Sequence, residues 1–323
     1  MSASDVKVEF TVVVSCFFEE KSIEEFHRRL LSTIRETKRS FEIIYVNDGS
    51  TDGTLVKLES IFDATPEVAA VIDLFKNVGQ ANAKTPGIMH ARGDALVLID
   101  SDLQLDPEEL PLLLSKYDEG YDIVSGIRSN RRDSLLRKMP SRIANFLMRK
   151  ASNRKLNDFG CTYKIYNMKL VRAFHFGSFS PWRMLPVIAQ AQNIAEVPIT
   201  HHPRKYGKSG WTFAKLFAYN METIVNLSER PFQYLALIFI LISFLILVRV
   251  AVAFVYPVSI FKAISNGLIL NVVVFGFLMT LATLVMIGEF VIRLFLSSQT
   301  KPAFIIRKLL RRDTPYAQQT NLD

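Results

Sequence analysis

Short apolar runs alternate with amphipathic stretches along the first part of the chain, up to about residue 200. Each run is rich in valine, isoleucine or leucine and is bounded by polar or turn-forming residues, which is the pattern of a buried strand. The runs lie at residues 10–17, 41–50, 68–75, 95–102 and 121–128. Because amphipathic stretches separate them, the pattern predicts an α/β fold with a mostly parallel sheet and helices on both faces.

Three of the intervening stretches have the apolar spacing of helices. They cover residues 22–38, 52–63 and 106–120. Ser22 stands just before the first stretch, and acidic residues follow in its first turn, which is typical of a helix start. In the third stretch we predict Asp106 as the N-cap and Pro107 as the first helical residue.

The pattern changes after about residue 230, where two long uncharged stretches follow one another. They run from Pro231 to Val248 and from Leu268 to Gly288, and each is close to the ~20 residues that a helix needs to cross a bilayer. Two such stretches so close together favour a transmembrane hairpin over buried core helices. The preceding segment, 206–230, fits an interfacial amphipathic helix and, almost equally well, an ordinary packed helix.

These patterns divide the chain into predicted parts. They are a cytoplasmic sheet domain at 1–205, an interfacial segment at 206–230, transmembrane helices at 231–256 and 267–296, and a cytoplasmic tail at 297–323. Lysine and arginine gather before the first span and after the second, whereas the loop between the spans carries a single lysine. The positive-inside rule therefore places the sheet domain and the tail in the cytoplasm, at a membrane that the chain crosses more than once.

The composition adds a basic balance. The 323 residues include 39 lysines and arginines against 31 aspartates and glutamates, a net charge of +8, which suits nucleic acid, anionic lipid or phosphate-bearing substrates alike. Cys16 and Cys161 are the two cysteines; they are able to pair, but a reduced cytosolic chain is favoured. The N-terminal residues lack an apolar signal core, so no cleaved export peptide is expected.

Polar clusters follow three of the predicted strands, where ligands of an open parallel sheet bind. They are Glu19-Glu20, residues 47–50, and Asp100-Ser101-Asp102. Side chains two apart on an extended strand point the same way, so we expect Asp100 and Asp102 to converge. Paired carboxylates suit a hard cation such as Mg²⁺ or Mn²⁺ that also binds substrate phosphates, although solvated loop acids fit the motif alone equally well.

No glycine-rich fingerprint follows the first strand. The segment "SCFFEEKS" contains no glycine, and this argues against a nicotinamide cofactor and against a P-loop nucleotide triphosphatase.

A set of motifs in fixed order resembles glycosyltransferase family 2. The motifs are "VVVSCFFEE", "NDGSTDG", "NVGQANAKTPGI", "GDALVLIDSDLQLDPEEL" and "YDIVSGIRSNRRDS". The later "NDFGCTYKIYN" and "RKYGKSGWTF", the two apolar stretches, and "GEFVIRLF" ahead of "KPAFIIRKLL" narrow the resemblance to polyisoprenyl-phosphate glycosyltransferases. These include bactoprenol glucosyltransferases, undecaprenyl-phosphate formamido-arabinose transferases and dolichol-phosphate mannose synthases. The resemblance covers almost the whole chain and implies a GT-A nucleotide-sugar fold.

The resemblance also implies roles for matching positions. The implied nucleotide-sugar site comprises Glu19, Asp48, Gln80, Asp100 and Gln104, with Asp102 and Asp100 as metal ligands. Arg128 and Arg131 match the arginines that approach donor and acceptor phosphates, and Arg204 and Ser209 match a segment that closes over the phosphates. Asp158 matches an acid near the acceptor, where it is either a base or a group that orients the acceptor or a sugar hydroxyl.

The implied reaction is the inverting transfer of one sugar from a nucleotide-sugar to a polyprenyl phosphate such as undecaprenyl phosphate. The implied partners are the donor, the lipid acceptor and the bilayer of a bacterial inner membrane, with Mg²⁺ or Mn²⁺ as cofactor and no nucleic acid. UDP is the expected nucleotide by resemblance only. The resemblance further suggests a homo-oligomer, a tetramer, in which a tail strand pairs with a neighbouring protomer.

Three other functions compete with this interpretation. A processive polysaccharide synthase would carry a Q-x-x-R-W segment and more spans, whereas the chain has "SPWRML". A nucleotidyltransferase would not need a membrane hairpin, and a binding protein without catalysis would not need the acids. The chain departs from the family at Phe18, where a polar residue is usual, and at Ser209, which lacks the usual basic residue after it.

Overall fold

The protein divides into two units of unequal size. The structure is a computed structural model, and it describes residues 7–129, 148–149, 152–154, 156–203, 205, 241–242, parts of 273–295, and 301–312. The first unit comprises Met1–Leu227 and Pro302–Asp323, and the second comprises Ser228–Lys301. The tail of the chain thus returns to the first unit.

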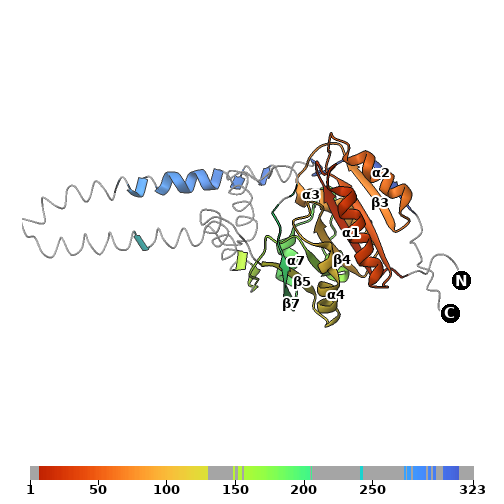
Figure 1. Cartoon of the computed structure of the whole chain (residues 1–323). Coiled ribbons are helices and arrows are strands. Elements are labelled where there is room, and N and C mark those ends of the chain that lie inside the picture. The colour runs from red at the N-terminus through yellow and green to blue at the C-terminus, as the bar shows by residue number, and fades with distance from the viewer. Residues whose placement is uncertain are drawn as a thin grey trace, which may run out of the picture. The chain divides into compact units, whose positions relative to one another are not determined.

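The first unit is built on one eight-stranded sheet (Figure 1). Its strands are β1 (Phe10–Cys16), β2 (Phe41–Asn47), β3 (Val68–Leu74), β4 (Ala95–Asp100), β5 (Ile123–Ser129), β6 (Lys164–Asn167), β7 (Ile194–Thr200) and β8 (Ile306–Arg311). The strand order is β7-β5-β6-β4-β1-β2-β3-β8. Strands β4, β1, β2 and β3 run parallel, so the predicted α/β fold with a mostly parallel sheet is confirmed.

Helices cover both faces of the sheet. They are α1 (Ile23–Glu36), α2 (Thr54–Ala64), α3 (Gln80–His90), α4 (Leu110–Asp118), α6 (Met168–Arg172) and α7 (Met184–Gln190), with a 3₁₀ turn at Pro107–Glu109. Helices α1, α2 and α4 contribute to one apolar core, and α3, α6 and α7 contribute to the other. Because both faces are covered, β2 and β3 are buried at every position, and this explains why their sequences are apolar without alternation.

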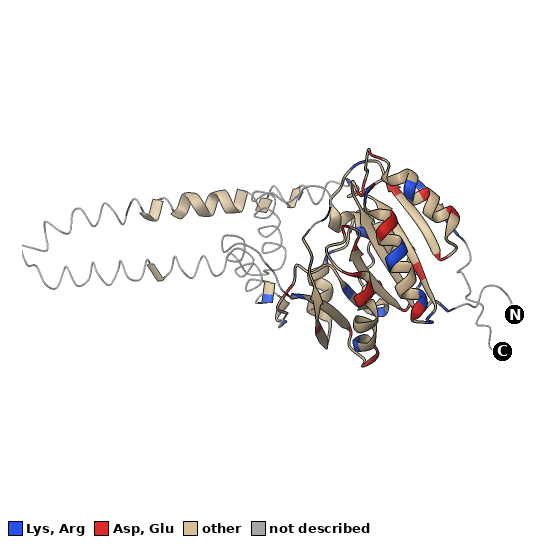
Figure 2. Ribbon diagram, viewed as in Figure 1, with Lys and Arg blue, Asp and Glu red and all other residues tan. Residues whose placement is uncertain are grey.

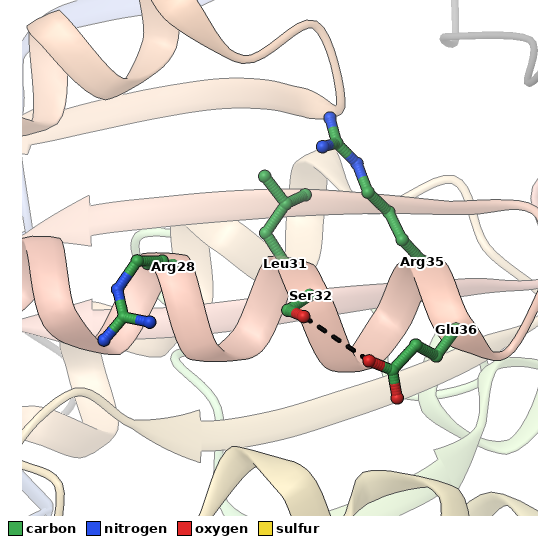
Figure 3. Close-up of a pocket in the computed structure, with 5 residues that line it drawn as sticks. All are labelled: Arg28, Leu31, Ser32, Arg35 and Glu36. Atoms are coloured by element: carbon green, nitrogen blue, oxygen red, sulfur yellow. Dashed lines mark hydrogen bonds between the residues drawn. The ribbon is translucent and has the colours of Figure 1, made fainter.

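Helix α1 shows how apolar spacing specifies the packing. Its fully buried apolar residues are Ile23, Phe26, Leu30 and Ile34, a helical spacing that places them on one face. The opposite face carries charges of both signs (Figure 2). A surface hollow on this helix is lined by Arg28, Leu31, Ser32, Arg35 and Glu36, none of them a predicted site residue (Figure 3).

We expect Phe26→Ala to destabilise the fold by about 3–5 kcal/mol, because it removes a fully buried ring from this core. The control is Arg28→Ala on the exposed face of the same helix, which should change the stability by less than about 0.5 kcal/mol. Thermal unfolding of the full chain in detergent measures both. Equal losses for the two variants would show that α1 does not pack on the sheet through this face.

Two local expectations hold for position but not in detail. Asp106 is at the N-cap position, but its side chain makes no capping hydrogen bond; its carboxylate instead accepts a hydrogen bond from Arg29 at 2.6 Å and pairs with His202 at 2.6 Å. The chain first forms a 3₁₀ turn with Pro107 as its first residue, and α4 begins only at Leu110. The side chain of Asp106 is therefore used to join α1 and residue 202 to this loop.

The tail strand β8 lies antiparallel to β3 of the same chain. Arg307 on β8 forms an ion pair with the buried carboxylate of Asp73 at 2.6 Å, and Asn47 donates a hydrogen bond to the other oxygen of Asp73 at 2.8 Å. The resemblance suggests that this tail strand pairs with a neighbouring protomer, whereas here it forms the edge strand of its own sheet.

The second unit is described at a few positions only, which are helical at 241–242 and between 273 and 295 and irregular at Lys301. The described positions from 279 to 288 carry no charge, and their large apolar residues, such as Leu281, Leu284 and Val285, are exposed. Over the positions that the structure describes, no helix combines the length and the apolar character of a membrane span. The hairpin at 231–256 and 267–296 and the segment at 206–230 therefore stay predictions.

Candidate active site

The polar clusters predicted at the strand ends meet at one edge of the sheet. Cys16 lies beside Asn47 in the register of β1 and β2, and Ser15 lies beside Asp100 in the register of β1 and β4. The loops are also linked directly, because the backbone N–H of Phe18 donates to Ser50 Oγ at 3.1 Å. The carboxyl ends of the parallel strands therefore form one continuous polar rim.

Asp48 is buried in a cradle of donors from the loop that precedes α3. Its carboxylate accepts hydrogen bonds from the backbone N–H groups of Val78 at 2.7 Å and Gly79 at 3.1 Å, and from Asn77 Nδ2 at 2.9 Å. Gly49 has a φ of +66°, and a Cβ there would lie 2.4 Å from the backbone of Lys76. Only glycine allows the two loops to approach this closely.

Burial raises the pKa of Asp48 to about 6, although the hydrogen bonds from Val78 and Gly79 act in the opposite direction. Near neutral pH the carboxylate is thus largely ionised but titrates close to the physiological range.

Asp100, the last residue of β4, is held by side chains from two other segments. Thr162 Oγ1 donates to its Oδ2 at 2.6 Å, and Lys84 Nζ lies 3.2 Å from its Oδ1, at ion-pair distance. The side chain of Gln80 also favours the charged form of Asp100. Burial alone would raise the pKa of Asp100, but Lys84, Thr162 and Gln80 together lower it. Asp100 is therefore an ionised carboxylate fixed in place.

The chain bends directly after Asp100. Residues 101–104 form bends rather than strand, and Leu103 has a φ of +57°. The extended backbone from which we expected Asp100 and Asp102 to converge therefore ends at Asp100, and their convergence stays a prediction. Asp102 Oδ1 instead accepts the backbone N–H of Gln104 at 3.1 Å, and Gln104 Nε2 donates to the carbonyl of His202 at 3.4 Å.

Arg128 and Asp158 form a buried bidentate pair. Arg128 Nε donates to Asp158 Oδ2 at 2.7 Å and Nη2 donates to Oδ1 at 2.8 Å. Asp158 is anchored in turn, because its backbone N–H donates to Glu196 Oε1 at 3.2 Å. A Cβ at Gly160 would lie 2.9 Å from Arg128 Nη2. The absence of a side chain at this position therefore leaves room for the guanidinium.

Sequence reasoning missed three residues of this site: Lys84, Thr162 and Lys164. Lys164 is buried, and its ammonium donates to the carbonyl oxygens of Phe159, at 3.3 Å, and Cys161. Burial lowers its pKa. Lys84 was detectable in principle, because it follows Gln80 by four residues on α3 and so shares its helix face. Thr162 and Lys164 are in "CTYKIYN", where nothing in the sequence indicates that the strand β6 lies beside β4.

Of the remaining predicted site residues, the structure describes Glu19 but not the three in the phosphate-binding segments. Glu19 is half-buried at the rim, its backbone N–H donates to Thr54 Oγ1 at 3.0 Å, and its carboxylate accepts a hydrogen bond from Ser22. Arg131, Arg204 and Ser209 lie outside the described residues. Cys16 and Cys161 are buried free thiols, as a reduced chain predicts.

Comparison with known families decides the class of protein. A family profile described as "Glycosyl transferase family 2" matches residues 11–174, which is half of the chain and includes β1 from its second residue, all of β2 to β4, and the pair Arg128 and Asp158. The chain belongs to glycosyl transferase family 2. This family 2 protein is thus a glycosyltransferase, and the family that its motifs resemble is confirmed.

Curated relatives of this family 2 glycosyltransferase extend the similarity beyond the sheet. An undecaprenyl-phosphate 4-deoxy-4-formamido-L-arabinose transferase of Pseudomonas paraeruginosa is 29% identical over 313 residues, which cover 93% of this chain and 90% of the relative. The enzyme of the same name from Klebsiella pneumoniae subsp. pneumoniae is 28% identical over 311 residues, 94% of each chain. Among solved structures, glucosyl-3-phosphoglycerate synthase from Mycobacterium tuberculosis is similar, with a TM-score of 0.49, 18% identity, and coverage of 68% of this chain and 79% of that one.

The donor set of the rim fits a hard divalent cation. Over the described residues, no three histidine, cysteine or acidic side chains gather around one point, so the protein alone does not form a closed metal cage there. Asp102 and Asp100 are the two carboxylates that could hold such an ion, and Oδ1 of Asp100, which accepts no hydrogen bond, lies 3.2 Å from Lys84 Nζ. Mg²⁺ typically uses one or two carboxylates and completes its shell with water and substrate phosphates, which suits this arrangement.

Proposed function

We propose that the protein transfers a single sugar from a nucleotide-sugar, with a UDP-sugar as the first choice, to a polyprenyl phosphate such as undecaprenyl phosphate. The observation that carries this proposal is the similarity to undecaprenyl-phosphate sugar transferases, which spans 93% of the chain and so includes the apolar C-terminal segments. Similarity restricted to the sheet would not indicate which acceptor the protein uses.

The donor half of the site would lie at the ends of β1, β2 and β4. Asp48 would accept a hydrogen bond from the nucleobase, and Glu19, Gln80 and Gln104 would contact the same donor. Asp102 would hold Mg²⁺ or Mn²⁺, which when bound neutralises the charge on the departing diphosphate. Asp100 is fixed by Thr162 and Lys84, and from this position it would orient the nucleotide.

The acceptor half would lie at Arg128 and Asp158. A lipid phosphate is an anion at neutral pH, so it attacks the sugar without first losing a proton to a strong base. Both oxygens of Asp158 accept hydrogen bonds from Arg128, which favours an orienting role for this carboxylate over a role as base. Arg128 would then present its guanidinium to phosphate. Attack from the face opposite the diphosphate inverts the configuration at the sugar carbon.

The bilayer would supply the acceptor. We propose that the segments 231–256 and 267–296 form a hairpin in a bacterial inner membrane, with the unit that holds the sheet on the cytoplasmic side. Their uncharged sequences and basic flanks support this arrangement. The segment 206–230 would rest at the membrane interface.

A donor screen tests the nucleotide part of the proposal. Purified full-length protein in detergent is offered radiolabelled UDP-, GDP- and dTDP-sugars together with undecaprenyl phosphate and Mn²⁺, and the organic phase is analysed. Transfer from at least one donor as a single sugar supports the proposal. Labelled polymer would instead indicate a processive synthase, and transfer of the nucleotide would indicate a nucleotidyltransferase.

The pKa of Asp48 predicts a pH dependence of donor binding. If the ionised carboxylate accepts a hydrogen bond from the base, donor affinity should fall below about pH 6, the value to which burial raises this pKa, with a limit of about tenfold per pH unit. The stability of the fold depends on pH in the opposite direction. Because the pKa of Asp48 is raised to about 6, the folded state binds the proton more tightly than the unfolded state does. The contribution of Asp48 to the free energy of unfolding is therefore lost as the pH rises through about 4 to 6.

The control for this prediction is Asp48→Asn, which removes the titrating group but keeps the shape of the side chain. UDP binding is measured for both proteins from pH 5 to pH 8, because the ratio of the two affinities cancels the titration of the UDP phosphates. A ratio that stays constant over this range would contradict the predicted role of Asp48.

A further inference from the structure

Lys84 pairs with the first carboxylate of the Asp100-Ser101-Asp102 motif in the interior of the protein. It lies in the second turn of α3, its side chain is 6% exposed, and that of Asp100 is 16% exposed. The ammonium stands 3.2 Å from Asp100 Oδ1, while Thr162 occupies Oδ2 at 2.6 Å. Each oxygen of Asp100 thus faces a protein group.

A buried ammonium is costly unless a nearby charge compensates it, so Lys84 and Asp100 depend on each other. Lys164 does not replace Lys84 in this pair, because its own ammonium donates to the backbone carbonyl oxygens of Phe159 and Cys161. Lys164 interacts electrostatically with Lys84, Arg128 and Asp158. A divalent cation bound directly to Asp100 would stand close to the ammonium of Lys84 and would be repelled by it.

We propose that Lys84 is a positioning residue that keeps Asp100 out of the metal's coordination shell, so that Asp102 is the carboxylate ligand and Asp100 is reserved for the nucleotide. This inference rests on the proposed function, since it concerns the metal and donor of that same site. The two acids of the motif have different surroundings. The charge of Asp100, the last residue of β4, is neutralised by Lys84, whereas Asp102 lies in the bend that follows the strand.

Mn²⁺ binding to the full chain in detergent tests the inference without any need for turnover. Free Mn²⁺ is measured by electron paramagnetic resonance, with the metal alone and with UDP added. Asp100→Asn should keep the Mn²⁺ affinity of the wild type within about twofold, whereas Asp102→Asn should weaken it by about tenfold or more.

Lys84→Met should tighten the binding of Mn²⁺ alone by about tenfold, because it frees a carboxylate and removes a like charge. Adding Asp100→Asn to Lys84→Met should abolish this gain, since the gain requires the freed carboxylate. Lys57→Met is the matched control: Lys57 pairs with Glu24 on the surface of α2, and its loss should leave Mn²⁺ binding unchanged. A merely structural lysine would not produce tighter metal binding on removal.

Several results would overturn the inference. One is a loss of Mn²⁺ affinity in Asp100→Asn as large as in Asp102→Asn, which would make Asp100 a metal ligand. Another is a folded Lys84→Met protein whose Mn²⁺ affinity is equal to or weaker than that of the wild type. If Lys84→Met does not fold, the comparison of Asp100→Asn with Asp102→Asn still decides, because both keep Lys84.

The outcome also separates this inference from the proposed function. Wild-type protein that binds Mn²⁺ as described but makes no glycolipid would overturn the proposed function and leave the role of Lys84 standing. If the wild-type protein makes glycolipid and both asparagine variants lose Mn²⁺ affinity equally, the proposed function stands and the role of Lys84 is overturned. Absence of Mn²⁺ binding, with and without UDP, would overturn the role of Lys84 and the metal part of the proposed function together.

Discussion

Replacing Asp102 with alanine is expected to lower kcat by about 10³-fold, the largest effect that we predict for a single side chain of the rim. The reason is that Asp102 would be the carboxylate that keeps the metal beside the diphosphate, and without it the leaving group departs with its charge uncompensated. Excess chelator should reduce wild-type turnover to a similar level. Radiolabelled glycolipid formed per minute by purified protein measures both.

The matched control is Asp63→Ala, which removes an exposed carboxylate from α2 and should leave kcat unchanged. Wild-type turnover in Asp102→Ala, or turnover that survives complete removal of divalent cations, would contradict a metal held at this position. A variant whose KM for the donor rises while its kcat is kept would instead place Asp102 in ground-state binding only.

The second large effect is expected at the Arg128–Asp158 pair. Arg128→Met should lower kcat/KM for the acceptor by about 10²- to 10³-fold, because it removes a guanidinium that would bind phosphate and leaves the carboxylate of Asp158 buried without its main partner. Arg128→Lys should restore only part of this loss, because an ammonium does not form the same bidentate contact. Initial rates at varied polyprenyl phosphate concentration give the values.

Asp158→Asn distinguishes orientation from base catalysis. If Asp158 orients Arg128, the variant should lose about tenfold to 10²-fold in kcat/KM but keep the shape of the pH–rate profile. Loss of the acidic limb of that profile would instead make Asp158 a base. Arg154→Met is the control for the arginine variants, since Arg154 donates to the backbone carbonyl oxygens of Ala189 and Gln192 and is not part of the rim.

The central strands were predictable because they are buried on both faces. In β2 and β3 every residue is buried, so the sequence has no polar alternation to obscure the run, and the amphipathic segments between strands fix the parallel crossovers. The same topology explains why the polar clusters at Glu19, Asp48 and Asp100 were predictable as neighbours. Parallel strands bring their carboxyl ends to one edge whatever lies between them.

Strands β6 and β8 were not predictable in the same way. Strand β6 lies inside the sheet and is largely buried, but it has only four residues and pairs antiparallel with β4 and β5. Strand β8 is an edge strand that joins β3 from the far end of the sequence, and three of its six residues are charged. Both strands are therefore specified by their partners rather than by an apolar run of their own. The placement of Thr162 beside Asp100 depends on β6 and was missed with it.

Local polar contacts were the least predictable part of the site. The motif Asp100-Ser101-Asp102 indicated paired acids, but the bend after Asp100 and the pair with Lys84 give the two carboxylates different surroundings. Asp106 looked like a helix cap and is instead bound by Arg29, 77 positions away in the sequence. The carboxylate of Asp106 also pairs with His202, 96 positions away. Side-chain pairing over such separations follows from the fold and leaves no local pattern.

The most direct measurement of the central claim uses full-length protein in vesicles with a radiolabelled UDP-sugar, with undecaprenyl phosphate present or absent and with Mn²⁺ present or chelated. The account predicts that label enters the organic phase as a single sugar on the lipid only when both the lipid phosphate and the metal are present. Label that enters the lipid phase without undecaprenyl phosphate, or a donor that is consumed only to form polymer, would contradict it.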